Sequence, residues 1–282
     1  MAAQTGTTAL ETTSPALSAA EFATVQEVLY SVVGINLQKG KEELVRTRLL
    51  KRLRVLGLPT FSAYLKLVSE DRSGQEFSKM VDVLTTNKTS FFREEQHFEF
   101  MIRELVPRWR QRRKAIRIWS AGCSSGEEPY TMAMLLREHL SDDEFRNLRI
   151  LASDLSSVVL KIARAGIYDP KQLATVPRPL LLKNFTAVTD SDTQRFAVRD
   201  ELRKIIRFAR LNLMGDWPMR GPFDAIFCRN VMIYFDDATR QTVVNRFWGL
   251  LPPNGHLFIG HSESLSTLST QFRYVCPALY VK

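Results

Sequence analysis

The chain has 282 residues, and its 39 Lys and Arg against 30 Asp and Glu give a formal net charge of +9. Hydrophobic residues make up 45% and charged residues 24%, ordinary globular values that exclude a wholly disordered chain, a collagen-like repeat and a coiled-coil rod. At about 150 residues per domain, this length predicts two domains. The excess positive charge predicts an anionic partner, which is nucleic acid, an anionic membrane surface or an acidic protein.

The sequence lacks the signatures of a secreted or membrane protein. Its apolar runs stay below the ~18 residues that a spanning helix needs, and the first twenty residues lack a basic stretch followed by an apolar core. The three cysteines, Cys123, Cys228 and Cys276, are too few and too far apart for a disulfide framework or a structural zinc site. We therefore expect a cytoplasmic protein with no membrane insertion and no metal.

The first third of the chain predicts a disordered tail followed by a small helical domain. Residues 1–19 are rich in Ala, Thr and Ser and show no periodic apolar face. Over residues 20–86, apolar residues recur at helical spacing. Helices are expected from Glu21 to a stop at Gly34, and at Lys41–Leu56, Phe61–Val68 and Phe77–Leu84.

The second of these helices has two different faces. Its apolar side is formed by Val45, Leu49, Leu50, Leu53 and Leu56. Its opposite arc is filled by Arg48, Lys51, Arg52 and Arg54. This pattern predicts an amphipathic helix that packs on the helical domain and presents a basic face.

The remainder predicts an α/β domain. After a linker and a first helix at residues 87–114, residues 115–282 alternate β-branched or aromatic runs with helical segments. The expected strands are Ala115–Ser120, Arg149–Ser153, Ile205–Arg210, Phe223–Cys228, His256–Gly260 and Ala278–Val281. Such alternation is typical of a doubly wound, mostly parallel sheet. A Pro-punctuated stretch at about 169–204 is too long for an ordinary connection, and we interpret it as an inserted small subdomain.

Ligands of such folds bind beyond the carboxyl ends of the strands. The first expected strand leads into S-A-G-C-S-S-G-E-E-P-Y, where small residues around Gly122 let a ligand approach the backbone. Glu127 and Glu128 would repel a phosphate but suit an ammonium group. Asp154 follows the second strand, where nucleotide-binding folds bind a ribose diol, although it also suits a helix cap.

Two later strand ends are also polar. Arg229 and Asn230 follow the Phe223–Cys228 strand and indicate either an active-site edge or a surface turn. Asn212 and Leu213 follow the strand that ends at Arg210, where the Asn side chain suits a base edge or an ordinary turn.

Five stretches together resemble the signatures of one family. They are T-x-N-x-T-x-F-F-R-E from Thr85, G-C-S-S-G-E-E-P-Y from Gly122, S-D at 153–154, F-D-A-I-F-C-R-N-V-M-I-Y-F from Phe223, and G-H-S-E from Gly260. In this order they resemble the CheR family of chemotaxis receptor glutamate O-methyltransferases. The resemblance implies a class I S-adenosylmethionine-dependent methyltransferase domain, a helical N-terminal domain and an inserted β-subdomain. It also implies S-adenosylmethionine as cofactor and S-adenosylhomocysteine as product.

The resemblance also implies the residues of the site. The implied cofactor contacts are Asn87, Thr89, Arg93, Gly122, one of Glu127 and Glu128, Asp154, Asn212, Leu213, Arg229 and Asn230. Glu128 is preferred for the methionine ammonium group, and Asp154 would hold the ribose diol. Arg93 and Tyr234 would flank the transferred methyl group as positioning residues.

The expected partners are the glutamate-rich cytoplasmic signalling helices of chemotaxis receptors. The resemblance implies that they dock on a basic face formed by Arg46, Arg48, Lys51, Arg52 and Arg54, although a merely solvated face is the alternative. The β-subdomain is where some members bind a receptor's C-terminal tether peptide.

Two other functions compete with this interpretation. A nucleic-acid methyltransferase is favoured by the charge alone, but the chain lacks an N-P-P-Y or D-P-P-Y motif for a flipped base. A scaffold that senses S-adenosylmethionine without turnover would be expected to lose Arg93 and Tyr234, which are present. We therefore expect no nucleic-acid partner.

Overall fold

The computed structural model describes residues 15–112, 114–190 and 193–282, so most of the expected tail lies outside the described residues. The chain divides into two compact units. The first runs to Val28 and resumes over Gln38–Leu84, and the second combines Leu29–Leu37 with Thr85–Lys282. Among the described residues, none of the helices combines the length and the apolar character of a membrane span.

The first unit is all-helical, as predicted. Its helices are α1 (Ala19–Val33), which continues into the second unit, α2 (Glu42–Leu56), α3 (Phe61–Glu70) and α4 (Gln75–Leu84). Ser18 caps α1 by exchanging hydrogen bonds with Glu21, and Thr60 caps α3. The core of the unit contains Phe22, Val25, Val45, Leu49, Leu53, Phe61, Tyr64 and Met80. The predicted helix ends are correct to within two residues.

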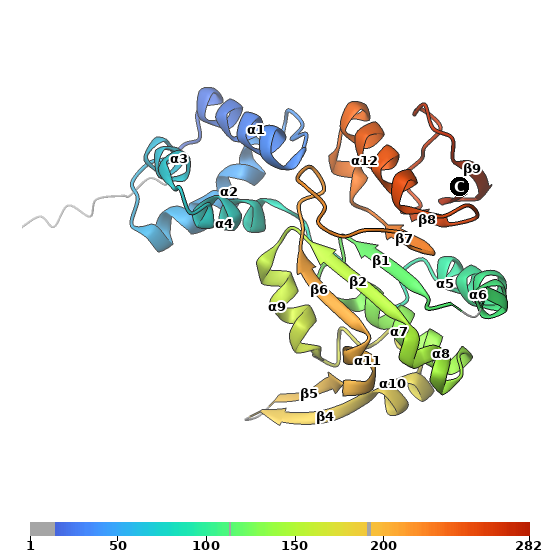
Figure 1. Cartoon of the computed structure of the whole chain (residues 1–282). Coiled ribbons are helices and arrows are strands. Elements are labelled where there is room, and N and C mark those ends of the chain that lie inside the picture. The colour runs from blue at the N-terminus through green and yellow to red at the C-terminus, as the bar shows by residue number, and fades with distance from the viewer. Residues whose placement is uncertain (1–14, 113, 191–192) are drawn as a thin grey trace, which may run out of the picture. The chain divides into compact units, whose positions relative to one another are not determined.

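The second unit is built on a seven-stranded sheet in the order β6-β2-β1-β7-β8-β10-β9 (Figure 1). The strands are β1 (Arg117–Ala121), β2 (Arg149–Asp154), β6 (Ile206–Arg210), β7 (Ala225–Cys228), β8 (His256–Ile259), β9 (Arg273–Cys276) and β10 (Leu279–Val281). The first five in the order are parallel, and β10 is antiparallel to both neighbours. This confirms the predicted doubly wound sheet. β9 was not predicted, because its mostly exposed residues form no apolar run.

Helices cover both faces of this sheet. They are α5 (Gln96–Phe100), a π-helical turn η1 (Met101–Leu105), α6 (Val106–Arg112), α7 (Glu127–His139), α8 (Asp142–Asn147), α9 (Ser157–Ala165), a 3-10 turn η2 (Met232–Tyr234) and α12 (Asp237–Leu250). Successive side chains of a strand point to opposite faces, so Ile118 and Trp119 belong to two different hydrophobic clusters. Phe227 stacks on Phe258 on one face, and Trp119 packs against Phe247 on the other.

A second, small sheet is inserted between β2 and β6 along the chain. Its antiparallel strands β3 (Ile167–Tyr168), β5 (Thr193–Val198) and β4 (Phe185–Asp190) lie in that order, accompanied by α10 (Arg178–Asn184) and α11 (Asp200–Lys204) (Figure 1). The structure begins the insertion at Ile167, two residues before the predicted boundary. In the large sheet, β1 lies between β2 and β7, so the strand order reverses there and the carboxyl ends of β1 and β7 flank the crevice where such folds bind ligands.

Candidate functional site

The loop after β1 is shaped by Gly122. Its φ of 89° is in the left-handed region, and a Cβ at this position would lie 2.3 Å from Cγ2 of Val231. Glycine therefore lets the loop after β1 pass closely over the chain that follows β7. α7 begins shortly beyond this loop, at Glu127.

A cavity of the second unit opens over the carboxyl ends of β1, β2, β6 and β7. Its lining includes all but one of the residues predicted for the cofactor or methyl group, namely Asn87, Thr89, Arg93, Gly122, Glu128, Asp154, Asn212, Leu213, Arg229, Asn230 and Tyr234. The exception is Glu127. The sequence interpretation therefore selected residues from the linker and four strand ends that the fold gathers around one space.

The two adjacent glutamates at the start of α7 have different surroundings. Glu128 lines the cavity, and its carboxylate accepts hydrogen bonds from Ser120 Oγ at 2.7 Å and from Arg229 at 3.0 Å. Burial raises the pKa of Glu128, and Arg229 opposes that rise. Glu127 is 2% exposed, accepts from Ser125 Oγ, and is absent from the cavity lining. Of the two glutamates, Glu128 is therefore the one that lines the cavity.

Asp154 joins two loops at the cavity. Its carboxylate accepts the backbone N–H of Ser124 at 2.8 Å and that of Ser156 at 2.9 Å. The cap of α9 is Ser156, whose Oγ accepts from Val159 N–H. Asp154 is thus a strand-end acid that faces the cavity, and the capping role considered from the sequence belongs to its neighbour.

Arg229 is the centre of a buried ionic network that the sequence did not reveal. Its side chain is 2% exposed. It donates to Glu94 Oε2 at 3.1 and 3.3 Å, to Glu128 Oε2 at 3.0 Å and to the carbonyl of Arg93, and it lies over the ring of Phe98. Burial alone would raise the pKa of Glu94, but Arg229 holds it below its usual range. Glu94 is the last residue of the linker motif T-x-N-x-T-x-F-F-R-E. No local sequence feature indicated its ion pair with Arg229, because the two residues are 135 positions apart.

Asn230 is held by an acid from the next strand end. Its φ is 58°, and its N–H donates to Glu263 at 2.9 Å. The same carboxylate accepts the N–H groups of Ile233 at 3.1 Å and of Gly260. Burial raises the pKa of Glu263, and these backbone donors oppose the rise. The acid of the G-H-S-E stretch therefore shapes the loop of Arg229 and Asn230.

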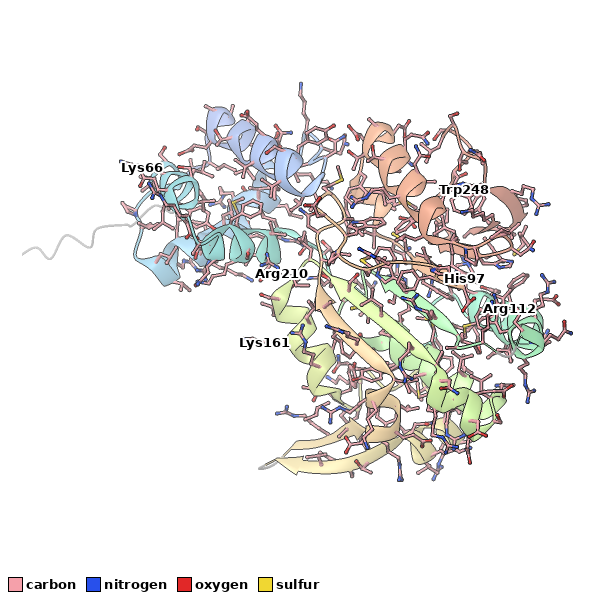
Figure 2. All side chains as sticks on the ribbon, in the orientation of Figure 1. Lys66, His97, Arg112, Lys161, Arg210 and Trp248 are labelled. Atoms are coloured by element: carbon pink, nitrogen blue, oxygen red, sulfur yellow. The ribbon has the colours of Figure 1, made fainter. Side chains whose placement is uncertain are left out.

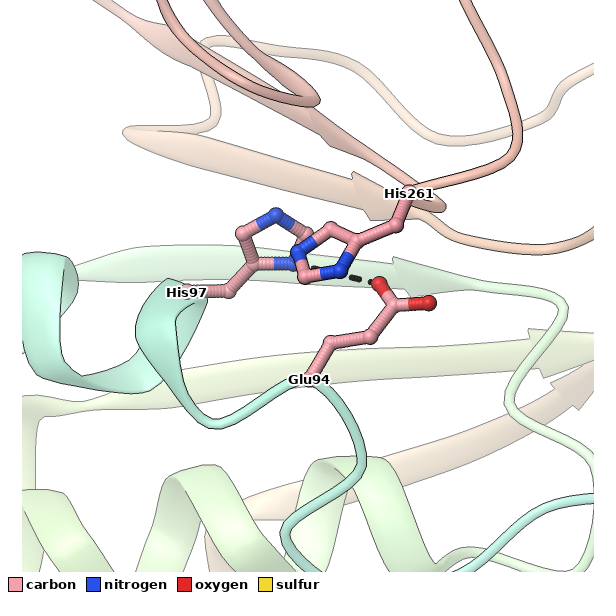
Figure 3. A group of neighbouring side chains, drawn as sticks. All are labelled: Glu94, His97 and His261. Atoms are coloured by element: carbon pink, nitrogen blue, oxygen red, sulfur yellow. Dashed lines mark ion pairs between the residues drawn. The ribbon is translucent and has the colours of Figure 1, made fainter.

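A group of metal-ligand side chain types lies beside Arg229. Glu94, His97 and His261 bring their ligand atoms within 4.8 Å of one another (Figure 3). His97 is 2% exposed, burial lowers its pKa to about 4, and its Nδ1 lies 3.6 Å from Glu94. These donors suit a divalent metal. The guanidinium of Arg229 lies against the same carboxylate oxygen and would repel a cation, so we assign no metal to this group.

The lining of the cavity includes residues that sequence reasoning missed. Val33 and Ile35, from the segment Leu29–Leu37, line it. The segment is anchored at both ends, because Asn212 Nδ2 donates to the Val32 carbonyl at 2.6 Å and Asn36 N–H donates to the Tyr234 carbonyl at 2.8 Å. Val33 and Ile35 were missed because they lie far along the chain from the motifs, the first of which begins at Thr85.

The two predicted positioning residues are held by the linker. Arg93 donates to the carbonyl of Lys88 at 2.8 Å, and the hydroxyl of Tyr234 donates to the carbonyl of Thr86 at 3.3 Å. Both side chains line the cavity and remain partly exposed. Both side chains are therefore reachable from solvent at the cavity.

The predicted basic face requires a correction within the first unit. Arg52 forms a two-pronged ion pair with the buried Glu76, at 2.8 Å for each contact, so it stabilises the helical core. Arg48 donates to the Leu84 carbonyl, and Arg46 pairs with Glu43 on its own helix. Lys51 and Arg54 are exposed. The helical wheel placed Arg52 opposite the apolar stripe, but could not show that α4 brings an acid to that side.

Positive charge outside α2 lies on several elements of the second unit. Figure 2 shows Arg112, Lys161 and Arg210 on three elements of the second unit, α6, α9 and β6. Arginines of α6 are paired with acids, including Arg110 with Glu144 at 3.0 Å and Arg112 with Asp224 at 2.6 Å. The charges of Arg110 and Arg112 are therefore balanced by neighbouring carboxylates.

The sheet order and the strand-end cavity define the class I S-adenosylmethionine-dependent methyltransferase fold. Two family models match the chain: "CheR methyltransferase, SAM binding domain" over residues 87–280 and "CheR methyltransferase, all-alpha domain" over residues 20–85. The chain therefore belongs to the CheR methyltransferase family, which confirms the resemblance found in its motifs.

Curated relatives match over nearly their whole length. The chemotaxis protein methyltransferase of Borreliella burgdorferi is 38% identical over 269 residues, covering 93% of this chain and 94% of the relative. The chemotaxis protein methyltransferase of Escherichia coli is 42% identical, covering 91% and 88%. Chemotaxis protein methyltransferase 2 of Pseudomonas aeruginosa is 41% identical, covering 92% of each.

Proposed function

We propose that this protein transfers a methyl group from S-adenosylmethionine to glutamate side chains of methyl-accepting chemotaxis receptors in the cytoplasm, forming glutamyl methyl esters. The observation that carries the proposal is the gathering of Glu128, Asp154 and Tyr234 around one strand-end cavity in a chain of this family. The expected partners are the receptors' signalling helices.

The residues present fit the cofactor. Carboxylates at Glu128 and Asp154 suit an ammonium group and a ribose diol, while Leu211, Leu213 and Val33 offer apolar contacts to a base. Asn87, Thr89, Arg93, Gly122, Asn212, Arg229 and Asn230 complete the proposed set of cofactor contacts. We leave Glu127 out of the proposed set because it is buried and is absent from the cavity lining.

The protein's own task is mainly positioning. When bound, S-adenosylmethionine supplies an electrophilic methyl group with a neutral leaving group. A glutamate carboxylate has a reference pKa of about 4.3, so it is already a nucleophile at neutral pH and needs no general base. Holding two reactants in line accounts for ~7–11 kcal/mol of barrier reduction in favourable cases.

Arg93 and Tyr234 are the proposed positioning residues for the glutamate. Tight pairing of the substrate carboxylate with a cation would stabilise the reactants, because charge is lost in the reaction. Arg229 is already paired with Glu94 and Glu128, so it orders the site without forming an ion pair with the substrate carboxylate. Arg93, on the more exposed side, orients the carboxylate through a weaker, hydrated contact.

The docking proposal uses the exposed part of α2. Lys51 and Arg54, supported by Arg46 and Arg48, would meet the acidic surface of the receptor helices, and Arg52 is withdrawn from this role. In the small sheet, β4 is an edge strand, which supports binding of a receptor's tether peptide by strand addition.

The test is incubation of the protein with labelled S-adenosylmethionine and receptor signalling domains, followed by analysis of the product. Alkali-labile methyl groups on glutamates are expected. Label on RNA alone would indicate a nucleic-acid methyltransferase, and cofactor binding with no transfer would indicate a sensing scaffold. Arg93→Ala should lower the rate at saturating cofactor and receptor, and an unchanged rate would exclude its positioning role.

A further inference from the structure

β6 is an outer strand of the large sheet, and a groove runs beside it (Figure 1). Within the described residues, its only strand neighbour is β2. The groove is lined by residues 206–208 of β6 and by Arg164, Asp200, Arg203 and Lys204, and we call it the β6 groove. None of these residues lines the strand-end cavity. The groove is therefore a part of the second unit that the proposed methyl transfer does not use.

The backbone of β6 presents polar groups to its outer side. Leu211, just beyond the strand, donates its N–H to the Asp154 carbonyl of β2 at 2.9 Å. In a strand the N–H and C=O groups of successive residues point alternately to the two sides, so those of residues 206, 208 and 210 face away from β2. The Phe208 carbonyl accepts a hydrogen bond from the Arg164 side chain at 3.3 Å, which agrees with this direction. An added strand could therefore pair with this edge.

Cations dominate the side chains of the β6 groove. They are Arg164, Arg203, Lys204 and Arg207. Among the described residues of the lining, Asp200 is the one acid, and it pairs with Arg203 at 3.3 Å. The next acid along the chain, Glu201, pairs with Arg137 outside the groove at 2.6 Å. The other three cations of the lining are exposed and have no acid within it to balance them.

The cations approach the outer edge from both faces of the sheet. Ile206 and Phe208 pack in one hydrophobic cluster, so the side chain of Arg207 between them projects from the opposite face. Arg164 belongs to α9, whose Leu160 packs in the same cluster as Ile206, so Arg164 comes from that cluster's face. A strand added beside β6 would therefore meet a cation on either face.

We propose that the β6 groove binds an acidic, extended segment of a partner protein, which is added to the sheet as a strand beside β6. An N–H of the segment would take the Phe208 carbonyl, and Arg164, released from that carbonyl, would pair with a carboxylate of the segment. The same cations disfavour pairing with a second copy of this chain, whose net charge is +9. The chain's own residues 1–14 contain a single acid, Glu11, and offer no matching charge. The inference does not depend on the proposed methyl transfer.

The test is a fluorescence anisotropy titration of the full chain with labelled peptides. The probe is a peptide of alternating Glu and Thr, about eight residues long, which is sufficient for one strand. It should bind with a Kd below about 1 mM, and the same peptide with Gln in place of Glu should bind at least about tenfold more weakly. The Glu peptide N-methylated throughout its backbone keeps its charges but lacks the N–H groups of a strand, so it should not bind. Bound Glu peptide should also slow amide hydrogen exchange in residues 206–210.

Charge reversals locate the peptide on the protein. Arg207→Glu and Lys204→Glu should each raise the Kd of the Glu peptide roughly tenfold, because an attraction becomes a repulsion. Both side chains are exposed, so thermal unfolding of each variant should stay close to that of the wild type. Arg273→Glu is the matched control, because Arg273 is an exposed arginine on β9, the strand at the other end of the sheet. It should leave the Kd within about twofold of the wild type.

Four results would each overturn the inference. The Glu peptide could fail to bind up to about 1 mM, or its N-methylated form could bind equally well, which would indicate ionic attraction without strand addition. Equal weakening in Arg273→Glu would place the peptide elsewhere. Tighter binding of inorganic tripolyphosphate or of an oligonucleotide than of the Glu peptide would make the groove a phosphate site, and the cations would then have no role in binding an acidic strand.

Discussion

Replacement of Arg52 by alanine should destabilise the helical unit rather than weaken receptor docking. Its guanidinium makes two 2.8 Å contacts to Glu76, which is 5% exposed and receives only longer contacts from Tyr64 at 3.3 Å and Lys79 at 3.4 Å. Removing one partner of a buried ion pair costs about 3–5 kcal/mol. Because Lys79 and Tyr64 remain, we expect about 2–3 kcal/mol here.

The assay is urea unfolding of the full chain, followed by circular dichroism, alongside the receptor KM. Lys51→Ala and Arg54→Ala are matched controls on the same helix, and should change the free energy of unfolding by no more than about 0.5 kcal/mol. They should raise the receptor KM and leave cofactor affinity nearly intact. The reasoning is wrong if Arg52→Ala unfolds at the wild-type urea concentration and raises only KM. Equal weakening of receptor and cofactor binding in the control variants would place docking elsewhere.

Two other predictions concern the second unit. Gly122→Ala should lower cofactor affinity at least about tenfold, because a left-handed φ costs an alanine about 1–2 kcal/mol and its Cβ would clash with Val231. In a binding titration, adding Val231→Ala should restore part of the affinity. Full affinity in the single variant would contradict the clash. Burial lowers the pKa of both His97 and His256 to about 4, from about 6.5 in the unfolded chain. The free energy of unfolding is therefore retained above pH 6.5 and falls as the pH drops toward 4. The loss is up to ~1.4 kcal/mol per pH unit for each histidine. Unfolding curves at pH 7, 6 and 5 should show a shallower loss for His256→Gln, and a slope equal to the wild type would exclude this histidine as a cause.

Periodicity was sufficient to predict the helices of the first unit and the parallel strands. Buried parallel strands read as apolar runs, as β7 and β8 do, and glycine marks the end of α2. The edge strand β9 has three exposed residues and no apolar run, and only its pairing with β10 defines it, which periodicity does not reveal.

In the candidate site, too, local sequence features were predicted and long-range contacts were missed. Polar residues at strand ends were recognisable because the fold brings those ends together. Glu94 and Glu263 were missed because each contacts a residue far along the chain. Ile35 was missed because the hydrogen bonds that hold its segment at the cavity come from Asn212 and Tyr234. The pairing of Arg52 with Glu76 was not predicted for the same reason, because an ion pair between two helices does not change the periodicity of either helix.

The course of α1 limits how this chain can be recombined with its relatives. The helix begins in the first unit and ends in the second, where the residues that follow it form part of the cavity wall. A hybrid enzyme spliced at the linker near residue 86 would therefore import Val33 and Ile35 together with a foreign helical domain. Because the proposed docking face lies on that helical domain, a graft meant to change receptor preference would also change these cavity residues unless it keeps the native residues 29–37.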